Sequence, residues 1–233
     1  MICVPVFGKD IEEIKALAKK AEDFCNILEL RIDLIDNIDS MFLKKVMDNL
    51  ALPVIVTNRA SWEGGNFQEG EEERIFLLEK AVEYGADFVD IEYATEKSLR
   101  DRIIRLGAKY GTKVILSHHD FEKTPSETEL LRLFDNIASE DSQVIKIVTY
   151  ASDNLDFLRL CPLYAKARER EKELIAFCMG RQGCYSRIYS INLGALLTFA
   201  CIERDLSSAP GQIPAKDMRD ILLRMDAVCD CKG

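Results

Sequence analysis

Regular alternation of strand-like and helix-like segments is the feature that most constrains the fold of this 233-residue chain. Short apolar, β-branched runs are separated by longer, charge-rich segments with helical periodicity. About eight such repeats, with no block of strands alone, predict a parallel sheet covered by helices. The predicted strands are Ile2–Val6, Ile27–Ile32, Val54–Thr57, Phe88–Glu92, Val114–Ser117, Val144–Val148, Leu174–Cys178 and a short one near Leu206.

The segments between the strands carry the signals of helix ends. Asp10 and Ser126 are predicted N-caps, and Glu129, three residues after Ser126, completes a capping box. Gly85 and Gly111 lie where helix C-caps are expected. The predicted helices include Asp10–Phe24, Met41–Leu50, Glu71–Tyr84, Ala94–Tyr110 and Ser126–Ser139.

Two architectures fit this alternation, an open doubly wound sheet and a closed barrel. The first strand is not followed by the glycine-rich loop of a dinucleotide-binding fold, which weakens the open sheet. Charged residues occur within or just after nearly every strand, and a barrel brings those strand ends to one mouth. We therefore expect one eight-stranded parallel (β/α)8 TIM barrel that spans residues 1–233 as a single catalytic domain.

Composition narrows the class of partner. The net charge of −9 and the lack of a long basic block argue against nucleic acid, although a local arginine cluster can still bind an anionic small molecule. The eight cysteines are scattered and lack the paired spacing of a zinc site. With no signal peptide and no apolar stretch of about 20 residues, we expect a cytoplasmic protein that acts on a small molecule, with no membrane partner.

Lys146 is the most informative single residue, because it interrupts the β-branched run of Val144–Val148. A charged ammonium in a buried strand is costly unless it is paired. A neutral lysine amine is a nucleophile that forms Schiff bases with carbonyl compounds. The competing interpretation is a lysine that faces water from an edge strand.

The only two histidines of the chain, His118 and His119, end the fifth predicted strand. Successive strand residues point to opposite faces, so one of the two is expected to enter the site. Adjacent histidines rarely bind one ion together, so a metal site is not indicated. A histidine for proton transfer one strand before Lys146 suits covalent carbonyl chemistry, in which an imine acidifies the neighbouring carbon.

Other polar residues at strand ends are weaker candidates. Glu29, Arg31 and Asp33 alternate along the second strand and should share one face, although a solvated polar face has the same pattern. The loops after the third, seventh and eighth strands carry further candidates, which an ordinary loop or turn would also explain. These are Arg59 and Glu63, Arg187, and Ser208 with Gln212.

Taken together and in order, these motifs resemble the type I 3-dehydroquinate dehydratases. The resemblance extends from the second strand to the eighth, and Lys146 lies 27 positions after His119. It implies a (β/α)8 barrel, a homodimer, and dehydration of 3-dehydroquinate to 3-dehydroshikimate in the shikimate pathway of aromatic amino acid biosynthesis, without metal or cofactor. The motifs are Glu29-Leu30-Arg31-Ile32-Asp33, Ser117-His118-His119-Asp120-Phe121, Lys146, Ser186-Arg187 and Ser208-Ala209-Pro210-Gly211-Gln212.

The resemblance also implies a role for each residue. Lys146 would form the Schiff base, His119 would act as general base and then general acid, and Glu63 would orient His119. His118 departs from the family, in which an aromatic residue is more usual at that position. The substrate-binding residues are expected to be Glu29, Arg31, Arg59, Arg187, Ser208 and Gln212.

Two alternatives remain open from the residues themselves. The first is a Schiff-base aldolase of the same fold, although the loops after the seventh and eighth strands lack a clear phosphate site. The second is a barrel that binds a small acid without turning it over. The joint presence of Lys146, His119 and Glu63 at strand ends argues against the second alternative.

Overall fold

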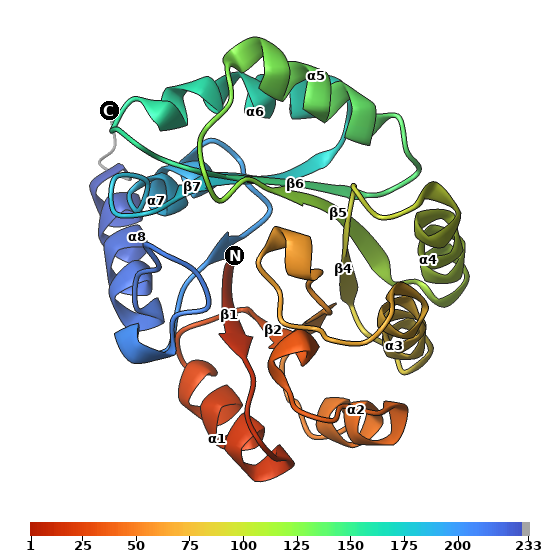
Figure 1. Cartoon of the computed structure of the whole chain (residues 1–233). Coiled ribbons are helices and arrows are strands. Elements are labelled where there is room, and N and C mark those ends of the chain that lie inside the picture. The colour runs from red at the N-terminus through yellow and green to blue at the C-terminus, as the bar shows by residue number, and fades with distance from the viewer. Residues whose placement is uncertain (230–233) are drawn as a thin grey trace.

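The computed structural model describes residues 1–229, and in that range eight parallel strands form a nearly closed barrel with helices on its outer side (Figure 1). The strands are β1 (Ile2–Val6), β2 (Ile27–Arg31), β3 (Val54–Thr57), β4 (Phe88–Glu92), β5 (Lys113–His119), β6 (Val144–Tyr150), β7 (Glu173–Met179) and β8 (Thr198–Phe199). The helices are α1 (Ile11–Ala21), α2 (Ser40–Met47), α3 (Glu71–Glu83), α4 (Lys97–Tyr110), α5 (Glu127–Ala138), α6 (Cys161–Glu169), α7 (Ser186–Asn192) and α8 (Ala215–Cys229).

Strand pairing confirms the predicted barrel. Consecutive strands pair in parallel from β1 to β7, and β8 returns to pair with β1, with Ile2 opposite Thr198. Between β7 and β8 the backbone N–H of Leu196 donates to the carbonyl of Leu174 at 2.9 Å. Because all strands run the same way, their carboxyl ends meet at one mouth.

The eighth strand lies earlier in the chain than predicted. The prediction near Leu206 was wrong, because that residue lies in a short 3₁₀ helix, η4 (Arg204–Leu206), that buries none of its residues. The backbone N–H groups of Thr198 and Ala200 instead donate to carbonyls of the first strand region. Exposed charges at residues 203–205 keep the Leu206 segment on the surface.

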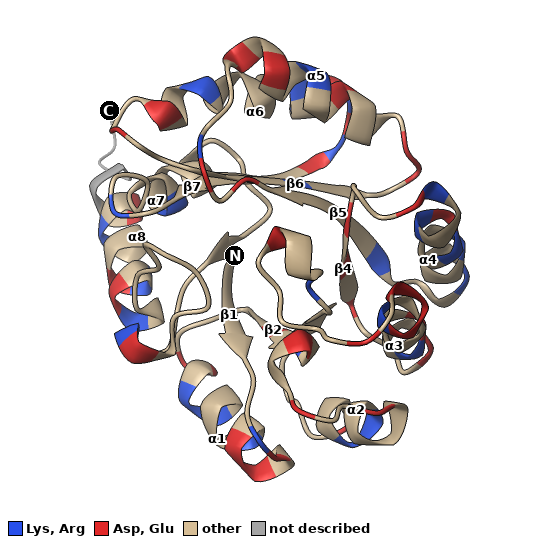
Figure 2. Ribbon diagram, viewed as in Figure 1, with Lys and Arg blue, Asp and Glu red and all other residues tan. Residues whose placement is uncertain are grey.

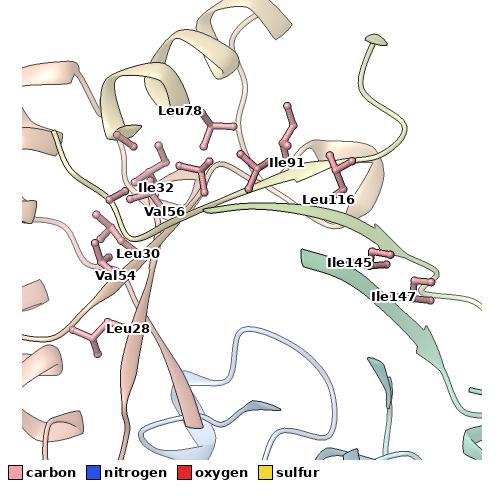
Figure 3. Close-up of a cluster of buried hydrophobic side chains, with 14 of the residues drawn as sticks. Leu28, Leu30, Ile32, Val54, Val56, Leu78, Ile91, Leu116, Ile145 and Ile147 are labelled. Atoms are coloured by element: carbon pink, nitrogen blue, oxygen red, sulfur yellow. The ribbon is translucent and has the colours of Figure 1, made fainter. Parts of the chain in front are cut away.

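Alternation along the strands creates two separate apolar cores. Ile27, Ile115, Val144 and Ile175 belong to a small core inside the barrel. The larger core fills the layer between strands and helices. In Figure 3 its strand residues include Leu28, Leu30, Val54, Val56, Ile145 and Ile147, which lie in one cluster with Leu78 of α3.

The helix ends follow the sequence signals. The Asp10 side chain accepts from the backbone N–H of Glu13, and Ser126 and Glu129 form the predicted capping box. Gly85 and Gly111 adopt positive φ at the ends of α3 and α4, which confirms their expected positions. The charged residues lie mainly on the outer helices (Figure 2). No helix in the described residues is long and apolar enough to span a membrane.

Candidate active site

One pocket at the carboxyl ends of the strands brings together all nine residues to which the family resemblance gives a role. They come from or directly follow six different strands, so no single segment of the chain contains the site. Those nine are Glu29, Arg31, Arg59, Glu63, His119, Lys146, Arg187, Ser208 and Gln212. Seven further residues complete the lining: Gly64, Phe121, Val148, Phe177, Met179, Phe199 and Ala209.

Lys146 points into the barrel because its neighbours Ile145 and Ile147 point out of it, into the helix layer (Figure 3). Only 3% of the residue is exposed. Its Nζ donates to Asp90 Oδ2 at 2.8 Å and lies 4.4 Å from the centre of the Phe199 ring. The ion pair and the aromatic face offset the cost of burying the amine.

Asp90, which was not singled out from the sequence, is the partner of Lys146. Asp90 Oδ2 also lies 2.8 Å from Nη2 of Arg59, and Ser117 Oγ donates to its Oδ1 at 2.6 Å. Burial raises the pKa of Asp90, but Arg59 and Lys146 outweigh burial and hold that pKa well below the ordinary value. The alternation of Asp90 with Glu92 along β4 was the signal that could have found it.

His119 is held by Glu63, which lies in a short 3₁₀ helix, η2 (Ser61–Glu63), after β3. Glu63 Oε2 accepts from the backbone N–H of His119 at 2.9 Å and lies 2.8 Å from its Nδ1. A proton on Nδ1 suits this contact and would leave the lone pair on Nε2. Burial, with the nearby cations Arg59 and Lys146, lowers the pKa of His119 well below the ordinary value. The imidazole is therefore a neutral base.

Burial acts in the opposite direction on Glu63. It raises the pKa of the carboxyl to about 8, although Arg59 opposes the shift and Glu92 adds to it. The carboxyl is 4% exposed, so it has little water to stabilise its charge. Glu63 and His119 thus form a buried pair in which burial disfavours the charged form of each.

His118 turns away from the pocket, as strand alternation predicts. Its side chain is 31% exposed, against 9% for His119, and it does not line the pocket. Its Nδ1 lies 4.0 Å from Glu63 Oε1, beyond hydrogen-bond distance. Burial lowers the pKa of His118. Phe121 covers His119 instead, with ring centres 6.3 Å apart.

Arg187, at the start of α7, is a buried cation that has a hydrogen-bond donor without an acceptor. Its guanidinium stacks on the Phe177 ring at 4.4 Å and donates to the carbonyls of Phe199 and Pro210 at 3.4 and 3.2 Å. Its Nε has no hydrogen-bond partner, and no carboxylate among residues 1–229 pairs with it. Burial lowers the pKa of Arg187 to about 10. Such a group is suited to bind a carboxylate.

The loop after β8 brings Ser208 and Gln212 to the pocket. Gln212 Oε1 accepts from the backbone N–H of Ser208 at 3.0 Å, and its Nε2 donates to Ser208 Oγ at 3.3 Å. Gly211 has φ of +77°, and a Cβ there would lie 2.3 Å from the carbonyl oxygen of Gly180. Glycine therefore allows this loop to pack against the end of β7.

Arg31 is oriented by a neighbour in sequence. Its guanidinium donates to both carboxylate oxygens of Asp33, at 2.8 and 2.7 Å. Asp33 lies in the 3₁₀ helix η1 (Ile32–Leu34) after β2 and does not line the pocket, so it supports Arg31 from behind. Glu29 accepts from the Thr57 hydroxyl at 2.8 Å. Within the described part of the chain, no three histidine, cysteine or acidic side chains are arranged to hold a metal ion.

The barrel agrees with what comparison with known proteins finds. A family model of type I 3-dehydroquinase matches residues 2–227. The chain belongs to the type I 3-dehydroquinase family. Nearly the whole chain is matched, so barrel and pocket both fall inside the family model.

Individual members of the type I 3-dehydroquinase family support this assignment. The 3-dehydroquinate dehydratase of Methanococcus maripaludis strain C5 is 37% identical over 222 residues, which cover 95% of this chain and 98% of that protein. The solved enzyme of Geobacillus kaustophilus has a TM-score of 0.89 at 27% identity, over 97% of this chain and 91% of that one. The type I enzyme of Clostridium difficile, solved with covalently modified comenic acid, has a TM-score of 0.88 at 27% identity, over 97% and 92% of the two chains.

Proposed function

We propose that the protein converts 3-dehydroquinate to 3-dehydroshikimate through a Schiff base on Lys146. Family membership supports the dehydratase activity, a hydro-lyase step of the shikimate pathway. The observation that carries the covalent mechanism is that the Lys146 amine and the His119 imidazole line one pocket from adjacent strands. This membership also favours dehydration over the aldolase and the non-catalytic alternatives.

Lys146 starts the reaction by giving up one proton of its ammonium group and attacking the substrate ketone as a neutral amine. Return of that proton and loss of water from the adduct give a protonated imine, whose positive nitrogen withdraws electrons from the adjacent carbon. A proton on that carbon becomes acidic enough for a neutral imidazole to remove. The enzyme thus converts a poor carbon acid into a good one without a metal or cofactor.

His119 performs the proton transfers. Its Nε2 removes the proton from the carbon next to the imine, and the resulting imidazolium gives a proton to the departing hydroxide. Glu63 fixes the ring orientation and tautomer through its contact with Nδ1. Hydrolysis of the imine then releases the product and restores Lys146.

Arg187 would bind the substrate carboxylate, because it is a buried cation that lacks a carboxylate partner in the described residues. The remaining polar groups of the pocket would hold the substrate hydroxyls and help with the carboxylate. These groups are Glu29, Arg31, Arg59, Ser208 and Gln212.

Two further properties are proposed from the family resemblance. The protein would act in the cytoplasm as a homodimer on a small-molecule substrate. Sedimentation of the purified protein tests the oligomer, since a monomer at micromolar concentration would contradict it.

Reductive trapping tests the mechanism directly. Incubation with 3-dehydroquinate and borohydride should add the mass of the reduced substrate to the intact protein, and peptide mapping should place it on Lys146. Lys146→Met should abolish both the adduct and detectable turnover. Lys113→Met removes a lysine from the opposite end of the neighbouring strand and should still form the adduct. No adduct in the unmodified protein, or an adduct on another lysine, would refute the mechanism.

A further inference from the structure

The carboxylate of Asp90 is placed to act on the reacting nitrogen itself. It is fully buried in β4, and its Oδ2 lies 2.8 Å from Lys146 Nζ, closer than Glu29 Oε1 at 3.9 Å. Asp90 is therefore the nearest anion to the atom on which the proposed imine forms. Asp90 contacts that atom although it does not line the pocket that would hold the substrate.

The other contacts of Asp90 fix it in place. Arg59 donates to the same Oδ2, and Ser117 donates to Oδ1 at 2.6 Å. Arg59 is itself divided between Asp90 and Glu92, at 2.8 Å from each. Arg74 completes the network by pairing with Glu92 at 2.6 Å. Asp90 Oδ2 is thus shared between Arg59 and Lys146, while Ser117 holds Oδ1.

We propose that Asp90 is a further catalytic residue, the fixed counter-ion of Lys146 Nζ in its two charged states, the resting ammonium and the protonated imine. The inference rests on the proposed Schiff-base function. Overall, one ammonium and one ketone give one iminium ion and one water molecule, so the charge on the nitrogen is the same before and after. A single stationary anion can stabilise both states, and no rearrangement of the network is required.

Asp90 is suited to be a fixed anion and not a proton acceptor. Arg59 and Lys146 hold its pKa well below the ordinary value despite its burial, so it stays ionised while protons move elsewhere. The protonated imine is the electron sink of the dehydration, and a neutral imine is a far weaker one. By stabilising the charged imine nitrogen, Asp90 would keep the adjacent carbon acidic enough for His119 to remove its proton.

Other charged or titratable groups surround this nitrogen and must be considered in any pH test. They reach it from the strands and loops packed around it, and none is as close as Asp90. The groups are Glu29 from β2, Arg59 after β3, His119 from β5 and Cys3 from β1.

Replacement of Asp90 by asparagine removes the charge and keeps the shape. With Asp90→Asn, kcat should fall about 100-fold, in the range seen when one preorganised electrostatic contact is lost. The pH at which the amine begins to be trapped, and the pH at which the imine loses its proton, should both move lower by about one to two units. A variant with wild-type kcat and an unmoved pH profile of cyanoborohydride trapping would overturn the proposal.

Two matched variants separate charge from packing. Asp90→Glu keeps the anion and disturbs the packing, so it should restore the wild-type pH profile even if the protein is less stable. Glu92→Gln removes the other carboxylate bonded to Arg59, on the same strand, without touching Lys146. It should lower stability but leave the pH profile of trapping unmoved. Equal shifts in Glu92→Gln and Asp90→Asn would overturn the proposal, because they would indicate a general effect of the network.

A spectroscopic measurement covers the case in which Asp90→Asn does not fold. The His119→Ala variant should accumulate the imine, whose carbon–nitrogen stretch shifts in D2O only if the nitrogen carries a proton. The proposal expects that isotope shift throughout the neutral and mildly alkaline range, and its absence near neutral pH would refute the role of Asp90. Failure of the unmodified protein to form any adduct would instead refute the Schiff-base function, so the two failures are distinguishable.

Discussion

At the residue scale, the His119–Glu63 pair is governed by burial. Burial lowers the pKa of the imidazole and raises that of the carboxyl, so both groups resist charge. The imidazole gains as a base because it remains unprotonated at neutral pH. Ionisation of Glu63 should lower the stability of the folded protein, because the buried carboxylate has little water around it.

The raised pKa of Glu63 predicts a particular dependence of stability on pH. A carboxyl whose pKa is about 8 in the folded protein and 4.5 in the unfolded chain contributes stability that is complete below pH 4.5. That contribution is lost as the pH rises through 8. Glu63→Gln cannot ionise, so its free energy of unfolding relative to wild type should increase between about pH 5 and about pH 9. Urea denaturation at several pH values measures this difference.

The control for this measurement is Glu169→Gln, at an exposed glutamate that ends α6. Its free energy of unfolding relative to wild type should stay constant over the same pH range. A Glu63→Gln curve parallel to that of the control would show that ionisation of Glu63 does not oppose folding.

The two histidines should differ sharply in function. His119→Ala should lower kcat by about 10²- to 10⁴-fold, the usual contribution of a general acid–base, while imine formation persists. His118→Ala should retain most of the activity, because its ring points away from the pocket. Steady-state kinetics with borohydride trapping measures both effects, and a larger loss in His118→Ala would reverse the assignment.

The sequence was most informative where a residue conflicted with its surroundings. Lys146 is a charge in an apolar run, and the two histidines mark a strand end, so their positions could be predicted. Asp90 was overlooked because its importance comes from contacts with Lys146 and Arg59, which lie 56 and 31 positions away. Its alternation with Glu92 indicated that the two carboxylates share one face of the strand, but it did not show which residues would contact that face.

At the element scale, helix signals were more reliable than the shortest strand. Capping depends on a few adjacent residues, so the motif of Ser126 and Glu129 is readable from sequence alone. The strand β8 has only two residues, and its position is set by pairing with β1, nearly 200 residues earlier. Local composition near Leu206 could not reveal that long-range pairing.

The capping box of α5 offers a test of stability that leaves the chemistry untouched. Ser126→Ala should lower the free energy of unfolding by about 1 kcal/mol, because a backbone N–H at the helix start loses its partner. Thermal or urea denaturation measures the loss, and kcat should stay at the wild-type value. Ser139→Ala, at the other end of the same helix, is the control and should cost less. Equal effects would indicate that the cap contributes little.

At the scale of the whole molecule, the buried cation Arg187 lies inside a protein whose overall charge is negative. The net charge is −9, yet Arg187 is available to an anion inside the pocket. Surface charges are screened by salt over about 10 Å, whereas a buried contact is screened much less. Binding of an anionic substrate should therefore depend on Arg187 itself and not on long-range attraction.

This arrangement predicts a weak salt dependence. KM should rise by less than about twofold between about 20 mM and about 200 mM salt. Arg187→Met should raise KM by roughly 10- to 100-fold at both salt concentrations, the effect of losing a charged hydrogen bond. Arg181→Met, at an exposed arginine in the turn before α7, is the control and should leave KM unchanged. A steep salt dependence of the wild-type KM would show that surface charges steer the substrate.

The pairing of β1 with β8 delays closure of the barrel until the end of synthesis. Ile2 leaves the ribosome 196 positions before its partner Thr198. At about 5–20 residues per second, the first strand waits roughly 10 to 40 s for the last one. Lys146 and His119 are synthesised before Phe199, whose ring contacts the Lys146 amine in the folded barrel. Catalytic competence is therefore acquired late, when the two ends of the barrel meet.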